Sequence, residues 1–310
     1  MEFYLVARHQ NPHEPLQPPI GRTGKPESGR LSYSIDAVND FDPFFMELSK
    51  FCDVHILGVE TLIHEAGAGQ MEINFTHGDP LELADRVFLF KRTVRETALR
   101  HGIFATFMAK PMEAEPGSAM HIHQSIVDAD GKNIFSKADG SASAEFFHYI
   151  AGLQTYVPQV MPMFAPYVNS YRRLSPFMSA PTNVSWGYDN RTCGIRIPNS
   201  DAHNRRIENR VPGVDVNPYL AIAATLACGY QGMVDALQPA EPLSTSAWNM
   251  AHDLPHHLED AIEKLRACTP MHDLLGAKFV DAFCAVKELE YGTYNRVISS
   301  WEREHLLLLV

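Results

Sequence analysis

The stretch ETLIHEAGAGQMEINF, residues 60–75, reads as two strands joined by a tight turn of small residues. TLIHE and QMEINF are rich in β-branched and apolar residues, and the AGAG between them lets the backbone turn sharply. A strand, a turn and a strand would bring Glu65 and Glu72 to one end of a sheet. The stretch alone still favours an ordinary alternative, in which the two acids are solvated at a hairpin.

Strand-like segments recur along the chain on both sides of this hairpin. They are runs of β-branched and aromatic residues bounded by Gly, Pro or Asn: EFYLV (2–6), IFATFMA (103–109), SAMHIHQSI (118–126), NVSWGY (183–188) and GIRI (194–197).

Helices are predicted where capping residues flank an apolar pattern. In residues 79–102, Asp79 is placed to cap, Pro80 takes the first helical position and Gly102 ends the helix. Residues 217–237 repeat this design and are apolar nearly all round, so we expect a helix buried at the centre. Further helices are expected at 42–52 and from about residue 255. Because no regular βαβ rhythm is present, we predict a mainly antiparallel α+β domain.

Composition restricts the class of protein. A net charge of -11 with no Lys/Arg cluster makes nucleic acid an unfavourable partner. Five scattered cysteines without Cys-x-x-Cys spacing indicate a reducing cytoplasm. No run of about 18 apolar residues is present to span a membrane, and the first residues do not resemble a signal peptide. We therefore expect a cytoplasmic protein without a membrane or nucleic-acid partner.

Acidic and imidazole groups at strand ends suggest a site for divalent ions. His121 and His123 form a His-x-His pair, but in a chain with 15 His residues about one such pair arises by chance. Glu2 and Glu208 also lie at strand ends. Hard divalent ions take carboxylate oxygens, tolerate an imidazole and leave positions open for phosphate. A carboxylate-rich site beside a mixed Glu/His site would suit phosphoryl transfer with two ions.

A group of arginines points to a negatively charged ligand. Arginine binds carboxylate and phosphate bidentately and stabilises charge on a transferred phosphoryl group. Surface ion pairs are the alternative explanation. The group lies in NSYRRL, DNRTCGIRIP and NRRIENRVPG and comprises Arg173, Arg191, Arg196, Arg206 and Arg210.

The order of these motifs carries a family resemblance. EFYL, HEAGAGQMEINF, GSAMHIHQS, NSYRRLSP, NRTCGIRIP, RRIENRVPG and NPYLAIAATLACG follow one another as in the catalytic domain of the glutamine synthetase superfamily. The segments ESGRLSYSID, NVSWGYDNRT and WEREHLLLLV resemble the branch of γ-glutamylputrescine synthetases and related γ-glutamyl-amine ligases. The resemblance implies a catalytic domain whose antiparallel strands line an active-site funnel flanked by helices.

The resemblance also implies a role for each matching residue. The chemistry would be ATP-dependent phosphorylation of the glutamate γ-carboxylate, followed by attack of an amine, with two or more Mg²⁺ or Mn²⁺ ions. The first ion would be held by Glu2, Glu65 and Glu72, and the second by His121 and Glu208. ATP would contact Glu60, His123, Ser125, Arg196 and Arg206. Glutamate and the γ-phosphate would meet Gly117, Arg173, Arg191 and Arg210.

Two positions depart from the family pattern and bear on the amine. Ammonia-using members carry a Glu on the flap after NSYxRL, and this chain has Ser179 there. Losing a carboxylate and gaining space favours an organic, putrescine-like amine over ammonium. Pro116 replaces the Asn that the family favours, so a backbone contact is expected at that point. A glutamine synthetase that uses ammonia is the alternative.

The start of the chain falls inside a family motif. Glu2 matches the second acid of a Glu-x-Glu pair, and the family's N-terminal β-grasp domain would precede Met1. We therefore expect residues 1–310 to be a catalytic domain without its β-grasp domain, poorly active by itself. The resemblance implies a ring-shaped homo-oligomer for the full-length form. A non-catalytic relative that binds nucleotide or metal is a further alternative.

Overall fold

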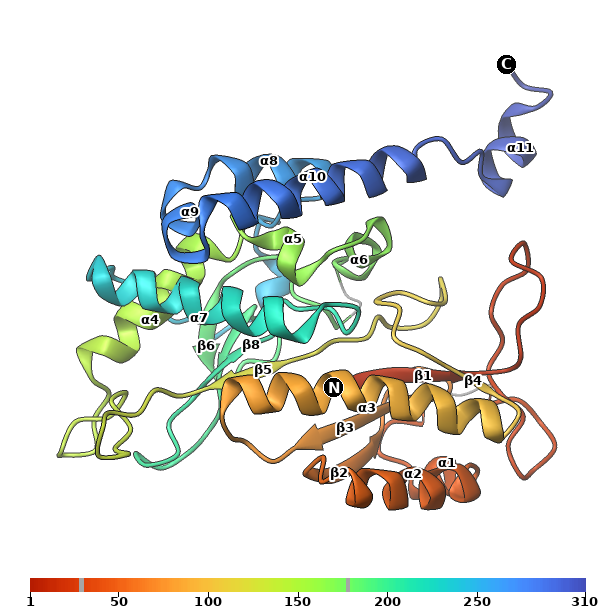
Figure 1. Ribbon diagram of the computed structural model, residues 1–310, viewed down its shortest axis with the longest axis horizontal. Coiled ribbons are helices and arrows are strands. Elements are labelled where there is room, and N and C mark those ends of the chain that lie inside the picture. Colours follow the sequence, from red (N-terminus) through yellow and green to blue (C-terminus); the bar gives the residue numbers. More distant parts are fainter. Residues whose placement is uncertain (28–30, 177–178) are drawn as a thin grey trace.

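The computed structural model describes residues 1–27, 31–176 and 179–310, which form two four-stranded sheets surrounded by helices (Figure 1). The first sheet is antiparallel throughout and runs in the order β2 (Val59–His64), β3 (Gln70–Phe75), β1 (Glu2–Val6) and β4 (Phe104–Thr106). The hairpin of β2 and β3 is the one predicted from residues 60–75. Glu65 N donates to Gln70 O at 2.8 Å, and Gly69 has a positive φ of 74° in the turn.

The second sheet is built from shorter strands. Its order is β5 (Ile122–Gln124), β8 (Ile207–Asn209), β7 (Ile195–Ile197) and β6 (Trp186–Tyr188). The pairs β5–β8 and β8–β7 are antiparallel, whereas β6 and β7 run parallel. The domain is thus α+β and mainly antiparallel, which confirms the predicted fold class.

The two sheets meet at the start of β1. Glu2 N donates to Ala119 O at 3.0 Å, and Ala119 N donates to Glu2 Oε2 at 2.8 Å. Ala119 belongs to the segment that leads into β5, and it also forms an antiparallel bridge with Gly213. Glu2 therefore lies at the junction of the sheets, with its carboxylate fixed by main chain from the neighbouring sheet.

Three helices accompany the first sheet: α1 (Ile35–Asn39), α2 (Asp42–Val54) and α3 (Pro80–Arg100). Asp79 caps α3 by accepting hydrogen bonds from Leu81 N and Glu82 N, and Gly102 follows it with a φ of 75°. The predicted start and stop of this helix are confirmed. α3 packs against α2 on one side and against α7 (Pro218–Val234) on the other, so it connects the two halves of the fold.

α7 packs most extensively on α4 (Ala144–Tyr156). A Cβ on Gly152 would lie 2.3 Å from Cys228 O, so only glycine permits this close approach of the two helices. The central position of α7 agrees with its nearly all-round apolar sequence, although Tyr230 and Val234 near its end stay exposed.

Helices α8, α9 and α10 form a layer across the top of the view in Figure 1. α8, α9 and α10 lie over α5 and α7, and α11 follows beyond the end of α10 close to the C-terminus. The helical region predicted from about residue 255 is confirmed. The bounds are α5 (Met161–Phe164), α6 (Val168–Arg173), η1 (Ala247–Asn249), α8 (Leu258–Ala267), α9 (Thr269–Leu275), α10 (Ala277–Tyr294) and α11 (Ser300–Leu306).

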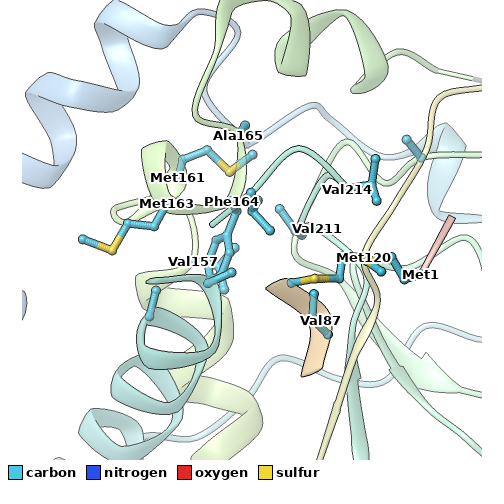
Figure 2. Packing of buried hydrophobic residues seen from close by; sticks show 14 of the residues in the cluster. Met1, Val87, Met120, Val157, Met161, Met163, Phe164, Ala165, Val211 and Val214 are labelled. Carbon is cyan, nitrogen blue, oxygen red and sulfur yellow. The ribbon is translucent and has the colours of Figure 1, made fainter. Parts of the chain in front are cut away.

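One hydrophobic core joins these layers. Figure 2 shows Met1, Val87 and Met120 lying together, although they come from the start of β1, from α3 and from the segment before β5. Val211 and Phe164 extend the same cluster toward the upper helices. All five residues are buried. Their close packing therefore holds in place the strand ends that carry the polar groups.

Several elements differ from the sequence prediction. The strands expected at 103–109 and 118–126 are only three residues long, and Glu208 lies in the middle of β8 and not at a strand end. The helices α1, α4, α5 and α6 were not predicted. Such short strands are paired by tertiary contacts and leave little periodicity in the sequence. Residues 9–27 run over the surface and are mostly exposed. Among the described residues, no helix is long and apolar enough to cross a membrane.

Candidate active site

A cavity of about 1110 Å³ opens between the two sheets, at the junction formed by Glu2 and Ala119. Its wall contains every site residue predicted from the sequence, so the structure brings together groups that lie up to 208 positions apart. Their individual roles stay predictions. These residues are Glu2, Glu60, Glu65, Glu72, Gly117, His121, His123, Ser125, Arg173, Ser179, Arg191, Arg196, Arg206, Glu208 and Arg210.

The first cluster of acids comprises Glu2, Glu65 and Glu72. Glu2 on β1 lies directly opposite Glu72 on β3, and Glu72 lies opposite Ile63 on β2. Glu65 follows Ile63 by two residues, so the pleat places it on the same face as Glu72. The amino group of Met1 lies 4.0 Å from Glu72 Oε1 and donates to Ile73 O. Strand pairing thus gathers three carboxyl groups in one corner of the cavity.

Two of these acids, Glu2 and Glu65, have raised pKa values. Burial, followed by the negative charge of Glu72, raises the pKa of Glu2 to about 7. Burial also raises the pKa of Glu65 to about 8, with help from a hydrogen bond to Glu72 and from the charge of Glu2. Carboxylates this short of positive charge fit a divalent cation, which would relieve their mutual repulsion.

The three acids of the first cluster do not yet form a complete metal site. In the part of the chain that the structure describes, no three potential ligand side chains stand close enough together to enclose an ion without moving. Ion binding would therefore have to draw Glu2, Glu65 and Glu72 closer to one another.

The second acidic position, Glu208 on β8, has a different environment. Arg210 donates to its Oε1 at 2.7 Å and Arg196 donates to its Oε2 at 2.7 Å. Burial opposes ionisation, but the charges of Arg210 and His123 and the hydrogen bond from Arg196 hold the pKa of Glu208 below its ordinary value. A buried carboxylate is thus kept ionised by two guanidinium groups.

His121 lies next to this carboxylate, as a shared second ion would require. Its Nδ1 is 3.5 Å from Glu208 Oε1. Burial, and then the positive charges of Arg210 and Arg173, lower the pKa of His121 well below its ordinary value. The imidazole is therefore neutral at physiological pH, which is the form that binds metals.

His123 also approaches Glu208. Its Nε2 lies 3.9 Å from the same Glu208 oxygen that His121 approaches. The reason is strand register, since His123 pairs directly with Glu208 across β5 and β8 and shares its face. Arg206 Nε donates to His123 Nδ1 at 3.3 Å, so the ring connects Glu208 to the outer part of the cavity.

The arginines of the cavity differ in how deeply they are buried. Arg173 is only 3% exposed, and it donates to Val211 O at 2.8 Å and to Arg210 O at 3.1 Å. Burial lowers the pKa of Arg173 to about 10. Arg196 pairs with Asp189 as well as with Glu208, and Arg191 is exposed. Arg173 thus also holds the main chain beside Arg210 in place, a function that the sequence did not indicate.

The loop before β5 packs closely on Arg173. A Cβ on Gly117 would lie 2.5 Å from Arg173 Cγ and 2.7 Å from Ala109 O, so glycine is required there. Tyr4 OH donates to Pro116 O at 2.7 Å. The carbonyl group of Pro116 is therefore held in place by Tyr4.

Gln70 and Trp248 line the cavity and were not among the site residues predicted from the sequence. Gln70 lies inside the motif that carries Glu65 and Glu72, and that position is the signal that could have identified it. Trp248 comes from η1, and its neighbour Ala247 donates its N–H to Thr192 Oγ1 at 2.8 Å. No local pattern marks this tryptophan. Ser179, on the same wall, has a positive φ of 67° and is exposed, while Phe177 and Met178 of the flap lie outside the described residues.

Comparisons with known proteins agree with this geometry. The family model described as "Glutamine synthetase, catalytic domain" matches residues 1–306. The chain is 36% identical over 310 residues to gamma-glutamylputrescine synthetase PuuA of Escherichia coli (strain K12), covering 99% of this chain and 66% of that protein. It is 35% identical over 260 residues to glutamine synthetase of Halobacterium salinarum, covering 80% of this chain and 57% of that protein.

A solved structure described as "GmaS/ADP complex-Conformation 1" has a TM-score of 0.85 and 30% identity, covering 99% of this chain and 71% of its own. The chain therefore spans about 57–66% of the length of the two relatives named above.

Proposed function

Because this chain belongs to the glutamine synthetase catalytic-domain family, we propose that its cavity joins glutamate to a small amine in an ATP-dependent ligase reaction. The observation that carries this proposal is the convergence of carboxylate, imidazole and guanidinium groups on one cavity between two sheets. A site that binds ATP, divalent ions and a dicarboxylate needs all three kinds of group.

The chemistry begins with a poor electrophile. A carboxylate does not react with an amine directly, so the γ-phosphoryl group of ATP is first transferred to a γ-carboxylate oxygen of glutamate. The amine nitrogen then attacks the carbonyl carbon, the bond from that carbon to the phosphate oxygen breaks, and the nitrogen loses a proton. The products are a γ-glutamyl amide, ADP and phosphate.

The residues divide this work according to their charge. Glu2, Glu65 and Glu72 would hold one Mg²⁺ or Mn²⁺ ion, and His121 with Glu208 would hold a second. Such ions neutralise charge on the phosphates of ATP. Arg191 and Arg210 would donate to the glutamate carboxylate and to the negative charge that develops during phosphoryl transfer. Arg196 and Arg206 would bind the phosphates of ATP, with Glu60, His123 and Ser125 as further nucleotide contacts.

The wall beside Ser179 supports an organic amine. The acids that line the described cavity are Glu2, Glu60, Glu65, Glu72 and Glu208, and each lies on or next to a strand of the sheets. Ala180, the chain neighbour of Ser179, and the neutral residues Thr192 and Trp248 also line the cavity. An indole face accepts an alkyl chain or a distal ammonium group, so a putrescine-like substrate fits this wall better than ammonium.

Two other functions remain as candidates. A glutamine synthetase using ammonia is favoured by the 35% identity to the Halobacterium enzyme. A non-catalytic relative that binds nucleotide or metal would keep the cavity and lose turnover. The ring-shaped oligomer of the full-length form, its β-grasp domain and the cytoplasmic location stay predictions.

The test is product identification by mass spectrometry. The purified chain is incubated for hours with ATP, Mg²⁺, glutamate and either putrescine or ammonium, with a control lacking glutamate to reveal simple ATP hydrolysis. We expect a γ-glutamyl amide from putrescine in excess of glutamine from ammonium. Glutamine as the main product would identify the synthetase alternative. Nucleotide binding with neither product would identify the non-catalytic alternative.

A further inference from the structure

We propose that Gln70 is a positioning residue that couples the first cluster of acids to the loop carrying Gly117. The inference deepens the proposed function and rests on it, because the cluster would bind a divalent ion and the loop would receive glutamate. Gln70 is 2% exposed and lies at the start of β3, between the two sheets.

The amide nitrogen of Gln70 joins three groups. It donates to Glu2 Oε2 at 3.2 Å, to Gly117 O at 3.1 Å and to Ser118 Oγ at 3.2 Å. Glu2 belongs to the acidic cluster, whereas Gly117 and Ser118 belong to the loop. One NH₂ group therefore spans from a predicted metal ligand to the predicted glutamate loop.

The amide oxygen fixes the direction of this bridge. Oε1 accepts from Gly67 N at 3.0 Å, and it shares the single proton of Tyr4 OH, 3.2 Å away, with Pro116 O. The groups around Nε2 include a carboxylate and a carbonyl, which only accept, and the groups around Oε1 donate. A carboxylate at position 70 would repel Glu2 and the Gly117 carbonyl, and an apolar side chain would make neither set of bonds. The surroundings thus require an amide.

A second set of bonds makes the coupling stiff. Glu2 Oε2 also accepts from Ala119 N at 2.8 Å, and Tyr4 OH also donates to Pro116 O at 2.7 Å. Four consecutive loop residues, 116–119, are therefore tied to Tyr4, Gln70 or Glu2. When an ion draws the Glu2 carboxylate inward, the loop has to follow. Ion and glutamate binding are then linked, and each tightens the other by the same factor.

The test measures this linkage directly. Free Mn²⁺ is titrated by electron paramagnetic resonance into the full chain, with and without saturating L-glutamate. In the wild type we expect glutamate to tighten Mn²⁺ binding about fivefold to tenfold. In Gln70→Leu the coupling factor should fall to about twofold or less, and Tyr4→Phe should give an intermediate factor because it removes one hydroxyl from the bridge.

Gln154→Leu is the matched control. Gln154 also donates to a main-chain carbonyl, Val184 O at 3.1 Å, and accepts from a main-chain N–H, Ala240 at 2.9 Å, but it lies outside the cavity lining. It should lose packing and hydrogen bonds of the same kind while keeping the full coupling factor.

The outcomes separate the two proposals. Full coupling in folded Gln70→Leu overturns the inference, and if that variant does not fold, full coupling in Tyr4→Phe overturns it. A wild type that binds both ligands and forms product without coupling overturns the inference alone. A wild type that binds no glutamate overturns the proposed function and this inference together.

Discussion

Glu72 and Glu208 stand on the two walls of one cavity, and their neighbours give them opposite electrostatic roles. Glu72 is surrounded by Glu2 and Glu65, whose pKa values are raised to about 7 and about 8. Glu208 is bracketed by Arg196 and Arg210, and its pKa is lowered. In the first cluster, three carboxyl groups lie near one amino group, that of Met1, 4.0 Å from Glu72, whereas Glu208 already pairs with two guanidinium groups.

This difference suggests how the arginines become available. In this structure, Arg210 and Arg196 each donate a hydrogen bond to Glu208. A cation bound at His121 and Glu208 would compete with these guanidinium groups for the carboxylate oxygens. We therefore expect the arginines to turn toward phosphate oxygens only when the second ion is present.

The largest effect is expected when the charge of Glu208, which lies between two arginines, is removed. Glu208→Gln should destabilise the protein by about 3–5 kcal/mol, because it leaves two guanidinium groups without their buried anion. Chemical denaturation in the absence of metal measures this change.

Glu72→Gln is the matched change in the acidic cluster. It removes one of three mutually repelling acids, so the stability should stay the same or rise by about 1 kcal/mol. Equal destabilisation by both variants would contradict the comparison of the two walls.

The next effect concerns turnover. Arg210→Ala should cost about 2–4 kcal/mol of transition-state stabilisation, as loss of a charged donor to a developing oxyanion does. Amide formation measured by mass spectrometry should fall in proportion, while Mn²⁺ still binds the first cluster. An unchanged rate would mean that Arg210 pairs with Glu208 and does not contribute to turnover.

A smaller effect follows from the raised pKa values of the acidic cluster. Because Glu2 and Glu65 bind protons more tightly in the folded state, their contribution to stability is complete below about pH 4.5 and is lost as pH rises through 7 and 8. The metal-free protein should therefore melt several degrees lower at pH 8.5 than at pH 6.

Added Mg²⁺ should restore most of this loss, since it binds the ionised carboxylates. Thermal melts with and without the ion make the comparison. A melting temperature that rises with pH in the metal-free protein would contradict the account.

The smallest effect tests whether Ser179 selects the amine. Ser179→Glu places a carboxylate where ammonia-using relatives carry one, and we expect the ratio of glutamine to γ-glutamyl amide to rise about fivefold, on the order of 1 kcal/mol. Ser179→Ala is the control and should leave the ratio unchanged. A shift of equal size in both variants would mean that space, rather than charge, selects the amine.

Part of the first cluster of acids could be predicted because two of its residues are close in sequence. Glu65 and Glu72 belong to one hairpin, and strand alternation places them on one face. The helix bounded by Asp79 and Gly102 was equally predictable, since capping depends on neighbouring residues. The predicted set of site residues is found on one cavity, but only the order of the family motifs pointed to that set.

The rest of the site depends on contacts between distant segments. Gln70 acquires its role from Tyr4 and from residues 116–118, so nothing next to it in the sequence announces the bridge. Arg173 donates to the main chain beside Arg210, and Trp248 enters the wall through a short 3-10 helix. His123 faces Glu208 because of a strand register that its sequence does not specify.

The central claim is that the cavity activates a glutamate carboxylate as an acyl phosphate, and isotope transfer tests it most directly. Glutamate labelled with ¹⁸O in its γ-carboxylate is incubated with the chain, ATP, Mg²⁺ and putrescine, and the released phosphate is analysed by mass spectrometry. Because the carbon–oxygen bond to phosphate breaks when the amine attacks, we predict one ¹⁸O atom in the phosphate for each amide formed. Amide formation that leaves the phosphate unlabelled would contradict the account.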